Sequence, residues 1–286
     1  MAKRNKAQRQ RTVRRPERLP RPKHRPAAVL SARRRGFLWL SLASIALFGA
    51  AALWWPREIP VWGFRVVQSL SHDAAAFTQG LLLHDGYLYE STGKRGRSEL
   101  RKVEPATGVV VARRVLPFDR FGEGLALAGD RFYQLTWGAG EALLWDRETL
   151  EPRGVVHYEG AGWGLTYDGR HLVMSDGSAR LRFLEPETFE PVRSIEVTFE
   201  GDPVKRLNEL EWIEGRLWAN VWRSDRIAVI DPDSGEVVAW LDLAGLHPNR
   251  VDAEAVLNGI AWDAATNKLY LAGKWWDRLY QIEVLR

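Results

Sequence analysis

The chain has 286 residues, 45% hydrophobic and 27% charged, so it can form a large folded domain and is neither collagen-like nor wholly disordered. It contains no cysteine, which excludes disulfide frameworks, cysteine-ligated zinc, iron–sulfur clusters and a thiol nucleophile. The net charge of +5 is uneven: residues 1–36 hold fourteen Lys and Arg against one acid, Glu17, and so carry +13, which leaves −8 on the other 250 residues.

An uncharged apolar segment follows this basic arm. Residues 37–55 read FLWLSLASIALFGAAALWW, and nineteen helical residues extend about 28 Å, close to the ~30 Å hydrocarbon core of a bilayer. Because the positive charges lie on one flank only, the arm is expected in the cytoplasm and the remainder outside it. We therefore predict a basic, disordered cytoplasmic arm at 1–36, a transmembrane or signal-anchor helix at 37–55, and an extracytoplasmic catalytic domain at 56–286.

Other interpretations of the amino-terminal segment stay open. Arg34 and Arg35 resemble a twin-arginine export signal, and the small residues at 49–52 offer a site for signal peptidase; if the anchor is cleaved, the protein is secreted to the periplasm or the extracellular space. A buried core helix is disfavoured because the apolar run has no polar face. The acidic body argues against nucleic-acid binding by the folded domain, which leaves only the basic arm as a candidate.

From residue 56 onward the sequence predicts an all-β fold made of repeated units. Short alternating runs are broken by Gly, Asp and Asn, and no long helical period appears. Five segments share a layout of four strands, and their opening positions lie 40 to 50 residues apart. Such a period is typical of propeller blades. We predict a five-bladed β-propeller, in which residues 64–70 supply the outer strand of the last blade and close the ring.

Equivalent positions of successive blades meet at one rim of a propeller, so we compared them. The position before each opening glycine, or its equivalent, holds Gln79, Glu123, Trp163, Asn208 and Asn258. The position five residues after the start of each second strand holds Gly93, Trp137, Gly177, Trp222 and Lys274. Two residues before the first two openings lie Phe77 and Phe121.

This set predicts a small-substrate pocket with aromatic walls, a lysine, carboxamides and a single acid. Each member has an ordinary structural explanation. Tryptophan and phenylalanine at strand ends are mostly packing residues, Asn and Gln near turns mostly cap the backbone, and a lone rim lysine is mostly solvated. Their joint occurrence at equivalent ring positions favours a site.

The motifs that carry these residues resemble the glutamine cyclotransferase family, the plant and bacterial type of glutaminyl cyclase. In chain order they read FTQG, FGEG, LTWG, GWGL, LNELEW, ANVW, LNGIAWD and LAGKWW, over residues 77–286. The resemblance implies a five-bladed propeller that converts an amino-terminal glutamine of a peptide or protein into pyroglutamate and releases ammonia.

Carried over motif by motif, the resemblance implies that Glu123 is the catalytic acid. It also implies that substrate is contacted by Phe77, Gln79, Phe121, Trp137, Trp163, Asn208, Trp222 and Lys274. Asn258 comes only from the repeat comparison and has less support as a substrate-binding residue. We expect Glu123 to shuttle a proton, with its pKa raised by burial. Lys274 is a second candidate catalytic residue, either as an oxyanion donor with Asn208, Gln79 or a Trp, or as a partner of Glu123.

No metal or cofactor is expected, because the six histidines show no ligand spacing and none occupies a rim position. The expected partners are peptides or proteins with amino-terminal glutamine, and the membrane through residues 37–55; nothing indicates an oligomer, so we expect a monomer. A non-catalytic extracytoplasmic binding module is the main alternative. A metal-dependent lactonase-type propeller is a weaker one, since only Glu123 is expected as an acid on the rim.

Overall fold

The computed structural model describes residues 58–286, and every regular element in this range is a strand. An all-β fold is therefore confirmed for this part of the chain. The predicted arm at 1–36 and helix at 37–55 lie outside the described residues, so both stay predictions. Within residues 58–286 no helix has the length and apolar character needed to cross a bilayer.

Three sheets consist of four consecutive antiparallel strands each. The first contains β2 (Thr78–His84), β3 (Tyr87–Thr92), β4 (Glu99–Val103) and β5 (Val110–Val115). The second contains β6 (Gly122–Ala128), β7 (Arg131–Thr136), β8 (Glu141–Asp146) and β9 (Pro152–His157). The third contains β10 (Leu165–Tyr167), β11 (Leu172–Ser175), β12 (Arg180–Leu184) and β13 (Pro191–Glu196).

The remaining long strands form one eight-stranded sheet in the order β16-β17-β18-β19-β1-β22-β21-β20. Its first half is β16 (Leu207–Ile213), β17 (Arg216–Val221), β18 (Arg226–Ile230) and β19 (Val237–Asp242). Its second half is β20 (Leu257–Asp263), β21 (Lys268–Gly273), β22 (Arg278–Leu285) and β1 (Val61–Ser71). A short hairpin of β14 (Thr198–Phe199) and β15 (Asp202–Pro203) lies between β13 and β16 in the chain.

β1 joins the beginning and the end of the described chain. Residues 63–71 pair antiparallel with β22, from Gly63 opposite Leu285 to Ser71 opposite Arg278, so the pairing predicted for residues 64–70 is confirmed. The first two residues of β1 also pair parallel with β19, an arrangement that the sequence did not suggest. This double pairing covers the outer edge of β22 and the part of the β19 edge at Trp240 and Leu241.

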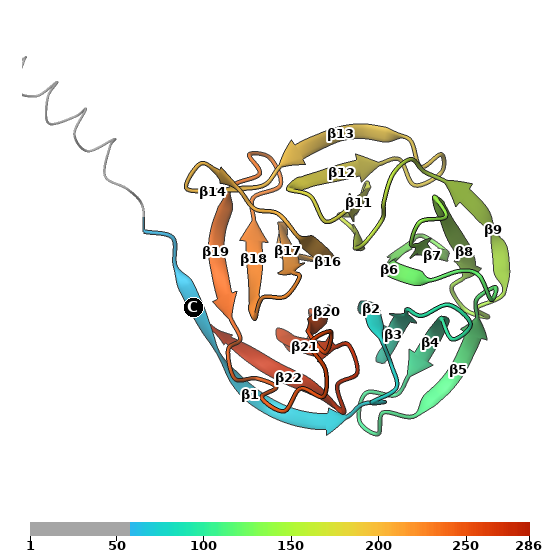
Figure 1. Ribbon diagram of the computed structural model, residues 1–286, viewed down its shortest axis with the longest axis horizontal. Coiled ribbons are helices and arrows are strands. Elements are labelled where there is room, and N and C mark those ends of the chain that lie inside the picture. Colours follow the sequence, from blue (N-terminus) through green and yellow to red (C-terminus); the bar gives the residue numbers. More distant parts are fainter. Residues whose placement is uncertain (1–57) are drawn as a thin grey trace, which may run out of the picture. The chain divides into compact units, whose positions relative to one another are not determined.

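The sheets are arranged around a common centre, with β2, β6, β16 and β20 nearest to it and β5, β9, β13 and β1 outside (Figure 1). Close backbone approach joins neighbouring inner strands. A Cβ atom on Gly124 of β6 would lie 2.4 Å from the backbone nitrogen of Leu165 in β10, so only glycine fits there. Between β20 and β2, the side chain of Asn258 donates a hydrogen bond to the Thr78 carbonyl at 3.0 Å.

The burial pattern follows this arrangement. Inner strands such as β6, with the sequence GEGLALA, are buried along nearly their whole length because neighbouring sheets cover both faces. Outer strands such as β5 are half-exposed. Apolar side chains of adjacent sheets pack together, as where Val173 of β11 and Leu217 of β17 share one buried cluster. The core is thus divided among the spaces between sheets, which leaves the central rim to polar and aromatic residues.

Candidate active site

One rim of the ring carries a cavity of about 320 Å³, lined by residues on the inner strands β2, β6 and β16 and by residues in the segments next to strands of every large sheet. Nine of the ten predicted site residues line it: Phe77, Gln79, Phe121, Glu123, Trp137, Trp163, Asn208, Trp222 and Lys274. Two residues that were not predicted, Lys94 and Glu254, complete the lining. The structure thus brings together side chains that are up to 197 positions apart, counting from Phe77 to Lys274.

A recurring backbone hydrogen bond aligns the rim residues. In the first sheet the Gly93 nitrogen donates to the Phe77 carbonyl at 2.8 Å, and in the second the Trp137 nitrogen donates to Phe121 at 2.9 Å. In the eight-stranded sheet the Lys274 nitrogen donates likewise to Val256 at 3.0 Å. This shared turn explains why counting along the repeats finds residues that meet in space.

Glu123 lies on β6, with only 5% of its surface exposed. No residue in 58–286 donates a hydrogen bond to its carboxylate, and its one significant electrostatic partner is Lys274. Burial disfavours the charged form and raises the pKa of Glu123 well above its usual range, while the positive charge of Lys274 offsets part of this effect. The site therefore contains a carboxyl group that holds its proton to a higher pH than an ordinary glutamate.

Lys274 follows β21 and is as deeply buried as Glu123. Burial lowers the pKa of Lys274 to about 8, and the negative charges of Glu123 and Glu254 limit the decrease. Its ammonium lies 4.7 Å from the ring centre of Phe77, within the range of a cation–π contact. The pair thus places one acid and one base, both with pKa values moved toward neutrality, in the same cavity.

Aromatic rings form the walls around these two groups. Phe77 and Phe121 meet edge to face with ring centres 6.0 Å apart, and Phe121 contacts Trp137 at 5.8 Å. On the other side, Trp163 and Trp222 meet at 5.9 Å. Gly93 makes room for this packing, because a Cβ atom there would lie 2.3 Å from the ring of Phe121. The walls are mutually supported and therefore positioned before any ligand enters.

Carboxamides supply the neutral polar groups. Asn208 on β16 has a side-chain oxygen that is buried and has no hydrogen-bond partner within the described chain. A buried acceptor without a partner is costly, and here it belongs to a residue that lines the cavity. Gln79 is held from behind, because its side-chain oxygen accepts a hydrogen bond from Asn258 at 3.3 Å.

Comparison with known proteins assigns the chain to a family. The family model described as glutamine cyclotransferase matches residues 39–284. The glutaminyl-peptide cyclotransferase of Arabidopsis thaliana is 36% identical over 284 residues, an alignment that covers 91% of this chain and 89% of the relative. This chain belongs to the glutamine cyclotransferase family. The crystal structure of Myxococcus xanthus glutaminyl cyclase matches this family member with a TM-score of 0.75 and 37% identity, over 79% of this chain and 98% of that one.

Two predictions about the site of this family member need correction. Asn258 was predicted to bind substrate, but it does not line the cavity; its amide instead donates to Thr78 and Gln79, behind the wall. Glu123 was expected to be the only acid on the rim, but Glu254 also lines the cavity. Glu254 lies in the loop before β20 and pairs with Arg223 at 2.6 Å.

Lys94 and Glu254 were missed for different reasons. Lys94 comes one residue after the rim position that the repeat comparison counted, and extending the count by one residue finds it. Glu254 belongs to the segment between β19 and β20, which is longer than the corresponding segments of the other units, so the repeat gave it no equivalent. A carboxylate on an irregular loop leaves no periodic signal.

Proposed function

We propose that this protein is a glutaminyl-peptide cyclotransferase, which converts the amino-terminal glutamine of peptides or proteins into pyroglutamate with release of ammonia. The observation that carries the proposal is the buried Glu123, which has no hydrogen-bond donor in residues 58–286 and lines an aromatic cavity of about 320 Å³ together with Lys274. Family membership and the name of the Arabidopsis relative support the same reaction.

The reaction is an intramolecular acyl transfer, in which substrate folding brings the reacting atoms together. The substrate α-nitrogen bonds to the side-chain carboxamide carbon, and the bond from that carbon to the amide nitrogen breaks. Glu123 accepts a proton from the attacking amine and returns it to the leaving nitrogen, which departs as ammonia. Its raised pKa suits this double role better than that of an ordinary glutamate, because the same group must accept and donate.

Negative charge develops on the carboxamide oxygen in the tetrahedral intermediate. Lys274 is the buried charged donor in the cavity and stabilises that oxygen, or else it holds the Glu123 carboxylate in place. Gln79, Asn208 or an indole N–H supplies the further polar contact. The unpartnered oxygen of Asn208 is suited to accept a hydrogen bond from the amino or carboxamide group of the substrate.

The aromatic walls have two functions in this proposal. Phe77, Phe121 and the indoles pack against the aliphatic part of the glutamine side chain and exclude water from the reacting atoms. Their ring faces also favour the positively charged α-amine as it enters.

In this proposal no metal or cofactor takes part in the reaction. Activity should therefore be unchanged after treatment with EDTA. Loss of activity that Zn²⁺ restores would contradict this.

We further infer that the fold is a five-bladed β-propeller, in which the eight-stranded sheet represents two blades joined by β1. The regular set of five inner strands β2, β6, β10, β16 and β20 supports this inference.

We also propose that residues 37–55 form a membrane anchor and that residues 56–286 lie outside the cytoplasm, as the charge distribution of the sequence indicates. External protease digestion of intact cells tests the orientation: the body should be cleaved if it is outside.

The activity is tested by incubating the full chain with a peptide that begins with glutamine. Mass spectrometry should show the loss of one molecule of ammonia, and a coupled assay should detect the same amount of ammonia in solution. The matched control is the same peptide with an acetylated amine, which cannot attack its own side chain. Absence of product from the free peptide would contradict the proposed function.

A further inference from the structure

The turns that follow the rim residues have an unusual backbone conformation. Lys94, Arg223 and Trp275 have φ angles of 90°, 63° and 59°, in the left-handed region that residues with a Cβ atom disfavour. In the second sheet the equivalent residue is Gly138, with φ of 73°, so glycine satisfies the same turn. A side chain at such a position lowers stability, and strained positions of this kind are concentrated at functional sites.

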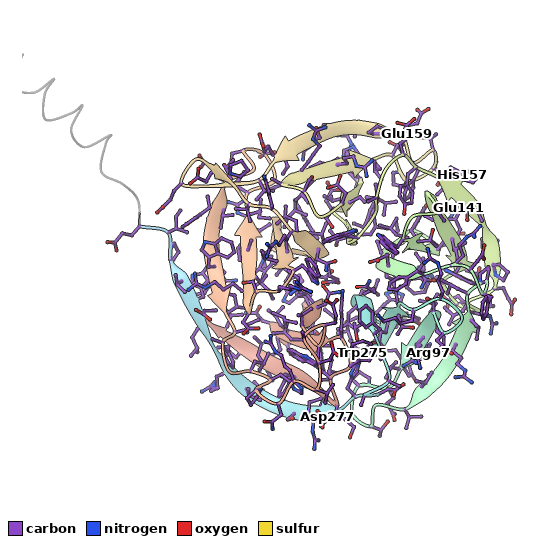
Figure 2. All side chains as sticks on the ribbon, in the orientation of Figure 1. Arg97, Glu141, His157, Glu159, Trp275 and Asp277 are labelled. Carbon is purple, nitrogen blue, oxygen red and sulfur yellow. The ribbon has the colours of Figure 1, made fainter. Side chains whose placement is uncertain are left out.

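Each of the three side chains either lines the cavity or contacts a residue that lines it. Lys94 lines it directly, Arg223 binds the lining residue Glu254, and the ring of Trp275 lies 4.7 Å from that of Phe77. Figure 2 shows Trp275 closer to the centre of the ring than Asp277, which follows two residues later. We refer to these three left-handed residues, Lys94, Arg223 and Trp275, as the second layer around the cavity.

Lys94 is the member of this layer without a counterion. Its ammonium lies 3.9 Å from the ring centre of Phe77 and 4.8 Å from that of Trp275. No carboxylate in residues 58–286 comes within 4.0 Å of it, whereas Arg223 is paired with Glu254. The turn itself is firmly held, because the Lys94 carbonyl accepts hydrogen bonds from the Arg97 nitrogen and the Ser98 hydroxyl, both at 2.9 Å.

The charges around Lys94 favour an anion at this point. Lys94 and Lys274 lie 3.9 and 4.7 Å from the centre of the same Phe77 ring. Glu254 would repel an incoming anion, but its carboxylate is paired with Arg223. The carboxyl group of Glu123 is buried. An ammonium has three N–H donors, and a substrate acceptor can bind those that the rings leave free.

A peptide substrate brings its own groups to this layer. If the amino-terminal glutamine fills the cavity, the following residues must leave through the mouth, and an extended chain advances about 3.3 Å per residue. The second and third residues therefore pass within reach of a lysine side chain on the rim. This step rests on the function proposed above.

We propose that Lys94 is a specificity-determining residue that binds a carboxylate of the substrate within two residues of the amino-terminal glutamine. That carboxylate is an acidic side chain at the second or third position, or the free carboxyl terminus of a dipeptide. The chemistry is the same in both cases, an ammonium–carboxylate pair over an aromatic surface.

Matched peptide pairs test this proposal on the full chain at low ionic strength. The pair Gln-Asp-Ala-amide and Gln-Asn-Ala-amide reports an acidic side chain, and the pair Gln-Ala with a free or an amidated carboxyl terminus reports the chain end. We expect kcat/KM to be about threefold to fivefold higher for the anionic member of at least one pair, as for a partly exposed ion pair. The ratio should fall toward one at high salt.

Three variants assign the preference to Lys94. In Lys94→Met the ratio should fall to about one, and in Lys94→Arg it should be retained. The matched control is Lys102→Met, because Lys102 lies over the Tyr87 ring at 4.2 Å, away from the cavity, and its loss should leave the ratio unchanged. Equal kcat/KM within both pairs for the unmodified protein, or a preference that persists in Lys94→Met, would overturn the inference. Turnover of the neutral peptides still establishes the proposed function in that case, whereas no turnover of any peptide overturns both.

Discussion

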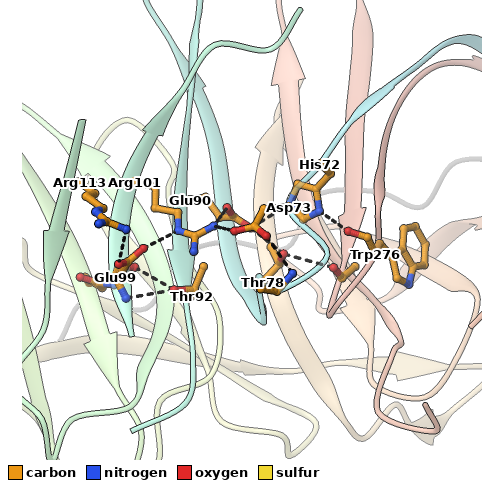
Figure 3. Close-up of polar contacts among 12 residues, drawn as sticks. His72, Asp73, Thr78, Glu90, Thr92, Glu99, Arg101, Arg113 and Trp276 are labelled. Atoms are coloured by element: carbon orange, nitrogen blue, oxygen red, sulfur yellow. Dashed lines mark hydrogen bonds and ion pairs between the residues drawn. The ribbon is translucent and has the colours of Figure 1, made fainter. Parts of the chain in front are cut away.

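Glu90 and Glu123 are two buried carboxylates on neighbouring sheets, with 2% and 5% of their surfaces exposed. Glu90, on β3, has several partners: the Thr78 hydroxyl donates to it at 2.7 Å, His72 at 3.1 Å, and Arg101 lies 3.8 Å away (Figure 3). Glu123 has only the charge of Lys274 in the same cavity. The two side chains therefore differ in their partners and hardly in their burial.

The difference in partners reverses the direction of the pKa shift. Burial raises the pKa of both glutamates, but at Glu90 the charges and hydrogen bonds of His72, Arg101 and Thr78 outweigh it, and its pKa is lowered. At Glu123 burial prevails and the pKa is raised. The partners of Glu90 thus keep its carboxylate ionised, whereas burial without such partners favours the protonated form of Glu123.

The network around Glu90 also supports the predicted site. Thr78 lies between Phe77 and Gln79, and its hydroxyl also approaches the Gly273 carbonyl, next to Lys274, at 3.3 Å. The second ring N–H of His72 donates a hydrogen bond to the Trp276 carbonyl at 2.7 Å. The network around Glu90 therefore holds two chain segments that contribute to the cavity, one with Phe77 and Gln79 and one with Lys274. Such support keeps the side chains of a site in position.

The largest expected effect is on turnover. In Glu123→Gln the shuttle can no longer accept a proton, and we expect kcat to fall about a hundredfold or more. Because the glutamine removes a buried ionisable group that has no hydrogen-bond donor among residues 58–286, the melting temperature should stay the same or rise. Steady-state kinetics and thermal unfolding measure the two quantities. Full turnover in this variant would remove Glu123 from the mechanism.

The corresponding change in the network should affect stability. In Glu90→Gln the buried charges of His72 and Arg101 lose their common partner, and we expect the free energy of unfolding to decrease by about 3 kcal/mol. Urea unfolding monitored by fluorescence measures it. The control is Glu283→Gln on β22, whose exposed pair with Arg65 should contribute much less. Equal losses in the two variants would show that the network is not a stabilising centre.

A smaller effect is expected on the pH profile. If Lys274 acts as a cation, kcat should decrease as the pH rises through about 8, where Lys274 loses its proton. Lys274→Arg keeps its charge at every accessible pH, so the alkaline decrease should move to higher pH in this variant even if kcat itself is reduced. An unchanged alkaline limb would assign it to another group.

The smallest effect concerns the pH dependence of stability. Burial lowers the pKa of His72, but the charge and hydrogen bond of Glu90 outweigh this and raise it above 6.5. A raised pKa in the folded state contributes stability that is fully present below pH 6.5 and is lost as the pH rises through the folded value. The difference in unfolding free energy between the wild type and His72→Leu should therefore be larger at pH 6 than at pH 9. A difference that grows with pH would contradict a charged His72.

The extent to which the sequence predicted this molecule follows from the repeats. Repeat spacing and strand pattern predicted the inner strands and the pairing of β1 with β22. Comparison of equivalent positions in the repeats predicted nine of the residues that line the cavity. The count fails where side chains leave the repeat. Asn258 occupies the expected position, and β20 has the same kind of register shift there as β2, β6 and β16 have at their cavity residues. Its amide nevertheless bonds to Thr78 and Gln79, a contact that the repeat does not encode.

Long-range contacts were beyond the sequence for a different reason. His72, Glu90 and Trp276 are joined across 18 and 204 positions, and nothing in the local pattern around His72 indicates either partner. The parallel pairing of β1 with β19 involves only two register pairs, too few to produce a hydrophobic pattern. The repeats thus predict which residues occupy equivalent positions in different sheets. They do not predict the contacts that join two particular sheets.

The central claim is that Glu123, buried without hydrogen-bond donors in the described chain, holds its proton to an unusually high pH. Infrared difference spectroscopy of the full chain across a pH titration measures this directly through the carbonyl band of a protonated carboxyl group. We expect a band that persists above the pH range in which ordinary glutamates ionise. Burial also raises the pKa of Glu209 and Glu211, so these groups contribute to the band. The band should therefore lose intensity in Glu123→Gln and keep its full intensity in Glu90→Gln. A Glu123 carboxyl that ionises at or below the usual range would contradict the account.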